Sequence, residues 1–124
     1  MKKQLATFIS AALAGAAISI GGAVFLCTES RPVGAALFSV GLFAVCTLGL
    51  DLFTGKVCYV FDNPSAYAAR CGLIWLGNLV GTLIAGTALR LTRLDIISKA
   101  QGICEAKLTD GPVSIFILAV FCNI

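Results

Sequence analysis

An acid, a hydroxyl and a lysine lie close together within an otherwise apolar stretch of this 124-residue chain. The segment reads Asp51-Leu52-Phe53-Thr54-Gly55-Lys56, and it becomes apolar again over residues 57–61. A carboxylate and an amine placed in this way could act as the acid–base pair of a membrane enzyme. The chain has no His, no metal-ligand spacing and no nucleophile–base pair, and these absences argue against such chemistry.

Two local structures fit this polar interruption, whose charged groups are costly to bury in a membrane. In the first, a helix ends at Leu50 and an interfacial loop follows. In the second, the helix breaks within the membrane and its freed backbone groups face a cavity, because non-helical backbone at that depth is tolerated only there. The apolar residues that resume after Lys56 favour the broken helix.

The composition of the chain identifies the environment of this segment. Hydrophobic residues make up 59% and charged residues 12%, against roughly 45–50% and 25% in soluble domains. So few charges cannot cover the surface of a water-soluble globule, which excludes a soluble enzyme, a disordered tail and a nucleic-acid binder. The net charge of +3 is also dispersed, without a basic patch. We therefore predict an all-α membrane protein.

Uncharged runs show where the membrane helices lie. Residues 4–28, 32–50 and 71–89 carry no charge, and a helix of about 20 residues spans the hydrocarbon layer. The first run also exceeds the roughly 7–15-residue apolar core of a signal peptide. The predicted segments are 5–28 (helix 1), 32–50 (helix 2a), 51–56 (break), 57–62 (helix 2b), 65–90 (helix 3), 91–110 (polar connection) and 112–124.

The last uncharged run, residues 111–124, is too short to span the membrane. We interpret it as the start of a fourth helix, with a re-entrant or interfacial segment as the alternative. The polar connection that precedes it is long enough to carry a surface helix near residues 96–104.

The third predicted helix contains a surface suited to close packing. Gly77 and Gly81 form a small-xxx-small face, which allows two helix backbones to approach closely in lipid. Asn78 is the strong amide of this apolar stretch. We expect it to hydrogen-bond to a neighbouring helix or to cap the broken segment of the second helix, unless it is simply a polar residue tolerated in a bundle.

These motifs carry a resemblance to a known family. Phe38-Ser39-Val40-Gly41-Leu42, followed by Leu50-Asp51-Leu52-Phe53-Thr54-Gly55-Lys56, resembles the broken second helix of the formate/nitrite transporter family. Trp75-Leu76-Gly77-Asn78-Leu79-Val80-Gly81 is similar to that family's third-helix signature. Ala106-Lys107-Leu108 and Cys122-Asn123 resemble the approach to its fourth helix and the middle of that helix. The resemblance covers nearly the whole chain in order.

The resemblance implies a fold and a function. Family members are multi-pass proteins of the plasma or inner membrane that act as channels or proton-coupled carriers for small monovalent anions such as formate and nitrite. It implies an aquaporin-like, six-helix subunit built as an inverted repeat and assembled as a homo-pentamer. The expected partners are the anion, a proton and the lipid bilayer, with no cofactor, no metal, no nucleic acid and no enzymatic activity.

The resemblance also assigns residues to the pore. Thr54 matches a threonine that lines it, and a hydroxyl can donate to a carboxylate or nitrite oxygen. Lys107 matches a lysine near the vestibule, where a cation would attract the anion. The other implied pore residues are Phe38 and Leu42 at one apolar constriction, Leu52 and Phe53 near the other, and Asn123 on the fourth helix. As alternatives, Phe38 and Leu42 are packing residues and Lys107 is a solvated loop charge.

Part of the family's pattern lies outside this sequence. The central histidine of the family belongs to the fifth helix, and a pore needs walls from both repeats. We therefore expect an incomplete half-transporter that does not conduct alone, with a non-conducting membrane interaction protein as the alternative function. Basic residues are balanced between the two membrane faces, so charge does not decide the orientation. The resemblance favours a cytoplasmic N-terminus.

Overall fold

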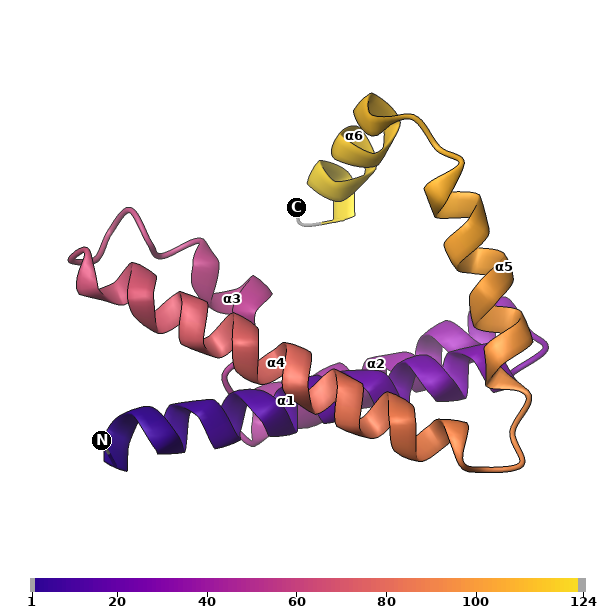
Figure 1. Ribbon diagram of the computed structural model, residues 1–124, viewed down its shortest axis with the longest axis horizontal. Coiled ribbons are helices and arrows are strands. Elements are labelled where there is room, and N and C mark those ends of the chain that lie inside the picture. The colour runs from indigo at the N-terminus through magenta and orange to yellow at the C-terminus, as the bar shows by residue number, and fades with distance from the viewer. Residues whose placement is uncertain (1, 123–124) are drawn as a thin grey trace.

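A computed structural model describes residues 2–122 of the chain, and every regular element in that range is an α-helix (Figure 1). The helices are α1 (Lys2–Cys27), α2 (Arg31–Thr47), α3 (Phe53–Val57), α4 (Ala66–Arg90), α5 (Ile96–Leu108) and α6 (Pro112–Cys122). The prediction of an all-α fold is confirmed.

Two of these helices, α1 and α4, are long and apolar enough to cross a membrane. They contain 26 and 25 residues, and a helix rises about 1.5 Å per residue, which makes each almost 40 Å long. The helices α2 and α6 are apolar but shorter. The chain is therefore an all-α membrane protein, as its composition predicted.

The helix α1 lies at the centre of the bundle, with α2 and α4 packed against it (Figure 1). The interior of this bundle consists mainly of small residues. In lipid, the close approach of helix backbones contributes more to stability than the burial of large apolar side chains does. A Cβ at Gly77 would lie 2.6 Å from the Cβ of Ala11, and one at Gly41 would lie 2.9 Å from the Ala17 carbonyl oxygen. Glycine is thus required at both contacts.

The break in the second predicted helix lies earlier in the chain than the sequence suggested. The sequence suggested helix to residue 50, a break at 51–56 and helix again over 57–62. In the structure α2 ends at Thr47, α3 runs from Phe53 to Val57, and residues 58–62 form turns. We call residues 48–52 the helix break. Its backbone ends α2 early because Gly49 has a φ of +62°, a conformation that glycine adopts without the steric penalty of a side chain.

The last two helices extend away from the bundle. Helix α5 lies within the predicted polar connection and packs beside the C-terminal ends of α1 and α4 (Figure 1). Helix α6 follows a turn at residues 109–111 and stands apart from the three packed helices (Figure 1).

Candidate functional site

The helix break starts with a hydrogen-bonded cap at the end of α2. The N–H of Leu50 donates to the carbonyl of Val45 at 2.9 Å, and the N–H of Gly49 donates to the carbonyl of Cys46 at 3.2 Å. This pair of bonds around a glycine of positive φ is the Schellman motif, which satisfies the last carbonyls of a helix. The chain therefore leaves α2 in a defined direction.

The side chain of Asn78 on α4 holds the other end of the break. Its Nδ2 donates to the carbonyl oxygens of Asp51 at 2.9 Å and Ala11 at 2.7 Å. Its Oδ1 accepts the N–H of Phe53 at 2.8 Å. Leu52, the N-cap residue of α3, has no side-chain acceptor of its own, so an amide from another helix performs the capping. We refer to these three hydrogen bonds as the Asn78 clamp.

A second helix also fixes the break. The N–H of Asp51 donates to the hydroxyl oxygen of Ser10 on α1 at 3.0 Å. The helices α1 and α4 therefore hold the backbone of Asp51 through two side chains. Ser10 was not predicted to belong to this site, although a hydroxyl in the apolar run of the first helix is a signal in the sequence.

The carboxylate of Asp51 lies between two cations. It is 3.8 Å from the Lys56 ammonium and 3.6 Å from the Arg70 guanidinium, and its own side chain is only 13% exposed. These distances exceed those of direct hydrogen bonds, so the attraction is mainly Coulombic. Both cations offset the cost of placing the carboxylate in apolar surroundings. Arg70 was not predicted to belong to this site.

The C-terminal end of α3 is attached to α4 as well. The carbonyl oxygen of Lys56 accepts a hydrogen bond from the Tyr67 hydroxyl at 3.1 Å and a weak one from the Cys71 thiol at 3.9 Å. Since Asn78 binds the first N–H of α3, this five-residue helix is anchored at both ends. The side chain of Thr54, between these anchors, is exposed.

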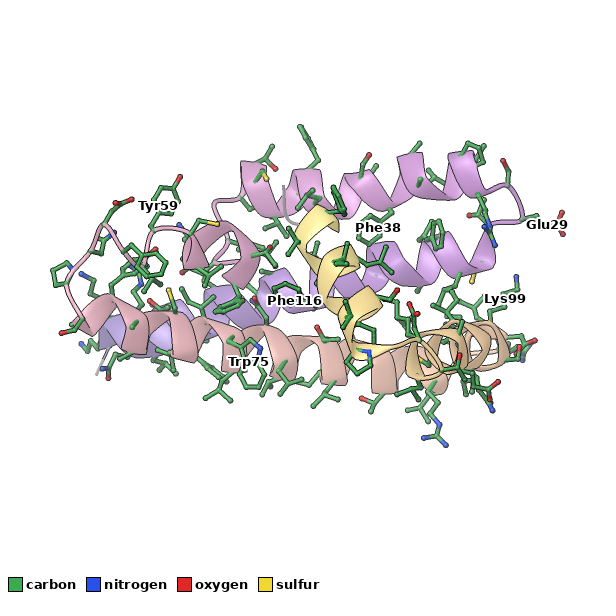
Figure 2. The ribbon with its side chains drawn as sticks, turned by 90° about the horizontal axis from the view of Figure 1, so that it is seen from above. Glu29, Phe38, Tyr59, Trp75, Lys99 and Phe116 are labelled. Atoms are coloured by element: carbon green, nitrogen blue, oxygen red, sulfur yellow. The ribbon has the colours of Figure 1, made fainter. Side chains whose placement is uncertain are left out.

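The structure distributes the other predicted pore residues over several elements. Leu52 and Phe53 are half-buried at the start of α3. Phe38 is half-buried on α2 and packs against Gly21 of α1 (Figure 2). The contact is so close that a Cβ at Gly21 would lie 3.3 Å from the Phe38 ring. Leu42, one turn further along α2, is exposed.

Two predicted residues are not part of this cluster. Lys107 is exposed near the end of α5, and α5 and α3 lie toward opposite ends of α4 (Figure 1). The structure therefore does not bring Lys107 to the helix break. Asn123 lies outside the described residues.

The predicted packing residues of α4 face α1. A Cβ at Gly77 would lie 2.9 Å from the Phe8 carbonyl oxygen, and one at Gly81 would overlap the backbone of Ala12. Gly15 of α1 in turn lies directly against the backbone of Asn78. This close approach brings the Asn78 amide within hydrogen-bond distance of α1.

Comparison with known proteins bears on the identity of the chain. The sequence profile of the formate/nitrite transporter family matches the chain over residues 1–124. No curated protein and no solved structure gives a significant match. Because the family profile covers the full sequence, the chain belongs to the formate/nitrite transporter family.

Proposed function

We propose that this chain forms one wall of a membrane pore for small monovalent anions such as formate or nitrite. The observation that carries the proposal is the exposed Thr54 hydroxyl on α3, a short helix anchored at both ends. A hydroxyl held on a fixed backbone can replace part of the water shell of a carboxylate or nitrite oxygen. A membrane-buried helix break is costly unless it lines such a cavity.

The apolar side chains assigned to the pore would set the form in which the anion passes. Leu52 and Phe53 directly precede Thr54 in the chain, and Phe38 and Leu42 lie on α2. An apolar neck makes the passage of a bare charge costly, whereas the protonated acid passes more easily. We infer that a proton accompanies the anion through the narrow part. Lys107 would act before this step, by attracting the anion to the vestibule.

The proposed pore requires a second wall. The side chains of Thr54 and Leu42 are exposed in the described structure, and a polar groove left open to lipid would be unfavourable. We propose that a second three-helix repeat, in the same protein or in a different partner protein, covers this face. In this proposal the N-terminus is cytoplasmic and the complete subunits form a pentamer.

The test uses liposomes that contain a conducting assembly of this chain with such a second repeat. Thr54→Val should lower formate flux by about tenfold, because it removes one hydrogen-bond donor to a charged substrate. Thr54→Ser should retain the flux. Thr47→Val is the matched control, since the Thr47 hydroxyl donates to the Phe43 carbonyl of its own helix at 2.9 Å. Parent-like flux from Thr54→Val would contradict the proposed role.

A second candidate function rests on the exposed apolar side chains of α6. The chain would be a non-conducting interaction protein that docks onto complete family members. Large apolar side chains are exposed on α6, including Phe116 and Phe121, which gives this helix a surface for contact with lipid or another helix. Stable co-purification with a complete homologue, without any effect on anion flux, would favour this function over the first.

A further inference from the structure

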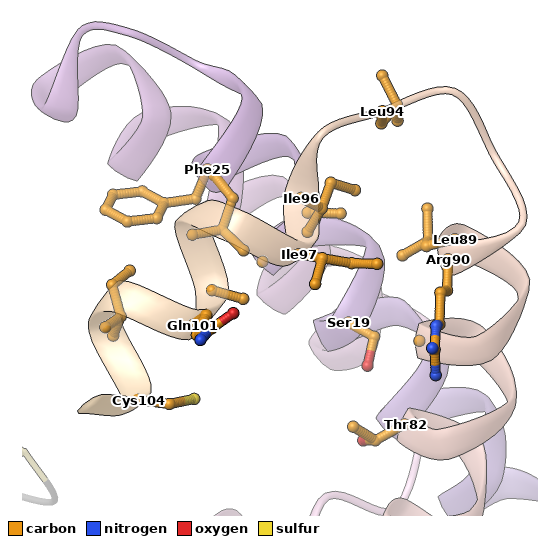
Figure 3. A pocket seen from close by; sticks show the side chains of 16 residues that line it. Ser19, Phe25, Thr82, Leu89, Arg90, Leu94, Ile96, Ile97, Gln101 and Cys104 are labelled. Carbon is orange, nitrogen blue, oxygen red and sulfur yellow. The ribbon is translucent and has the colours of Figure 1, made fainter. Parts of the chain in front are cut away.

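A cavity of about 710 Å³ lies away from the helix break, between the C-terminal parts of α1 and α4 and one face of α5 (Figure 3). Its volume falls within the range of roughly 300–1,000 Å³ that is usual for ligand sites. Its wall is almost entirely apolar. The residues that α5 contributes include Ile96, Ile97, Ala100, Ile103 and Cys104, which recur at the spacing of one helix face.

One cationic side chain lines this apolar cavity. Arg90 follows the uncharged run 71–89 and is the last residue of α4, which places it where that helix reaches the membrane surface. Its side chain extends back along α4 toward the level of Ser19 and Thr82 (Figure 3). Within residues 2–122, the ion pairs of the structure involve Asp51 and not Arg90.

The segment that begins at Arg90 carries a net positive charge. The segment 90–99 carries Arg90, Arg93 and Lys99 against Asp95, a net charge of +2 by three minus one. The Asp95 carboxylate accepts a hydrogen bond from Ser98 at 2.8 Å. On the same helix, the Glu105 carboxylate accepts one from Gln101 at 2.9 Å. Within residues 2–122 neither carboxylate forms an ion pair with Arg90, so Arg90 is available to an external anion.

We propose that this cavity binds an anionic phospholipid, with its phosphate against Arg90 and an acyl chain along the apolar wall. The charge lies at the membrane surface and the apolar volume lies beside the spanning helices, which matches the two parts of such a lipid. A second copy of this chain fits less well. Its most exposed apolar helix, α6, contains no acidic residue that could pair with Arg90.

The experiment measures access to Cys104 in the purified 124-residue chain in detergent micelles. Cys104 is a free, exposed thiol in the cavity wall, and Cys58 is a free, exposed thiol beyond α3. Phosphatidylglycerol and phosphatidylcholine with identical acyl chains are added in turn, and maleimide labelling is followed peptide by peptide. We expect phosphatidylglycerol to slow the labelling of Cys104 at about tenfold lower concentration than phosphatidylcholine, with no effect on Cys58.

Two pairs of variants separate the headgroup from the acyl chain. Arg90→Gln should abolish the preference for phosphatidylglycerol, whereas Arg93→Gln should keep it, because Arg93 does not line the cavity. Ala100→Phe places a phenyl ring in the cavity. Native mass spectrometry should show less retained phosphatidylglycerol on this variant than on Ala106→Phe, whose position is outside the lining.

Several results would overturn the proposal. If both lipids protect Cys104 equally, or if Arg90→Gln keeps the preference for phosphatidylglycerol, Arg90 does not bind the lipid phosphate. Equal lipid retention by Ala100→Phe and Ala106→Phe would place the lipid elsewhere. Protection of Cys104 that rises with protein concentration before any lipid is added would assign the cavity to a second copy of the chain.

Discussion

Replacing Asn78 with Leu should loosen the helix break while nearly preserving the volume of the side chain. The substitution removes three hydrogen bonds of 2.7–2.9 Å, which reach the Ala11 carbonyl, the Asp51 carbonyl and the Phe53 N–H. Hydrogen bonds between membrane helices contribute about 0.6 kcal/mol each on average. The Asn78 clamp therefore contributes about 2 kcal/mol. This value corresponds to a roughly 30-fold change in the equilibrium between the helix break held by Asn78 and the helix break released from it.

Two measurements on the protein in detergent test this value. The free energy of unfolding of Asn78→Leu should fall by about 2 kcal/mol, and the Phe53 amide should exchange its hydrogen roughly 30-fold faster. Thr82→Val is the matched control, because Thr82 also lies on α4 and donates to an α1 carbonyl, but over 3.4 Å. That variant should change stability by less than about 0.5 kcal/mol. If Asn78→Leu unfolds like the parent and Phe53 remains protected, the clamp does not hold the break.

Three further substitutions probe the bundle and the break by their effect on the free energy of unfolding. Gly81→Ala should cost more than about 1 kcal/mol, because its Cβ would overlap the α1 backbone. Gly72→Ala is the control: its Cβ would meet open space, and the variant should gain up to about 1 kcal/mol in helix propensity. If Gly81→Ala is as stable as the parent, this packing is refuted. Gly49→Ala should cost about 1 kcal/mol because of its φ of +62°, and an equal effect from Gly55→Ala would show that the positive φ is irrelevant. Asp51→Asn should lower the free energy of unfolding by no more than about 1 kcal/mol, since both paired cations are more than one-third exposed. If the difference between this variant and the parent stays the same at high salt, the role of Asp51 is not Coulombic.

Hydropathy carries most of the information about the long helices. The absence of charge over residues 4–28 and 71–89 follows directly from the cost of placing charges in lipid. Helix α1 contains the first run except for Thr28, and α4 contains the second. The all-α membrane class was predictable for the same reason. The family resemblance was also readable from short motifs around the break and on the third helix, and the family profile match confirms it.

The exact position of the break was not readable from hydropathy. Residues 48–50 are apolar and suggested continued helix, but Gly49 adopts a positive φ and ends α2 before the first charge. Hydropathy does not distinguish a glycine inside a helix from one at its C-terminal cap. The signal was the glycine itself, since a C-cap glycine commonly precedes the point where a chain leaves a helix.

The partners of the break depend on contacts between distant parts of the chain. Asn78 was identified because an amide is rare in an apolar run, and its possible roles could be stated. The contributions of Ser10 and Arg70 were missed because each has an ordinary local explanation, as a small polar residue in a helix or as a charge at a membrane end. Only the packing of α1 and α4 brings both side chains to Asp51.

The central claim, that this chain supplies one wall of an anion pore, is tested most directly by formate flux across liposomes. The 124-residue chain is reconstituted alone, over a series of protein-to-lipid ratios, and in a version extended by a matching three-helix repeat. We predict that a formate gradient decays no faster with the chain alone than in protein-free vesicles, and that the extended version gives saturable flux. Saturable flux from the chain alone, at any ratio, would contradict the account by showing that residues 1–124 form a pore without a second repeat.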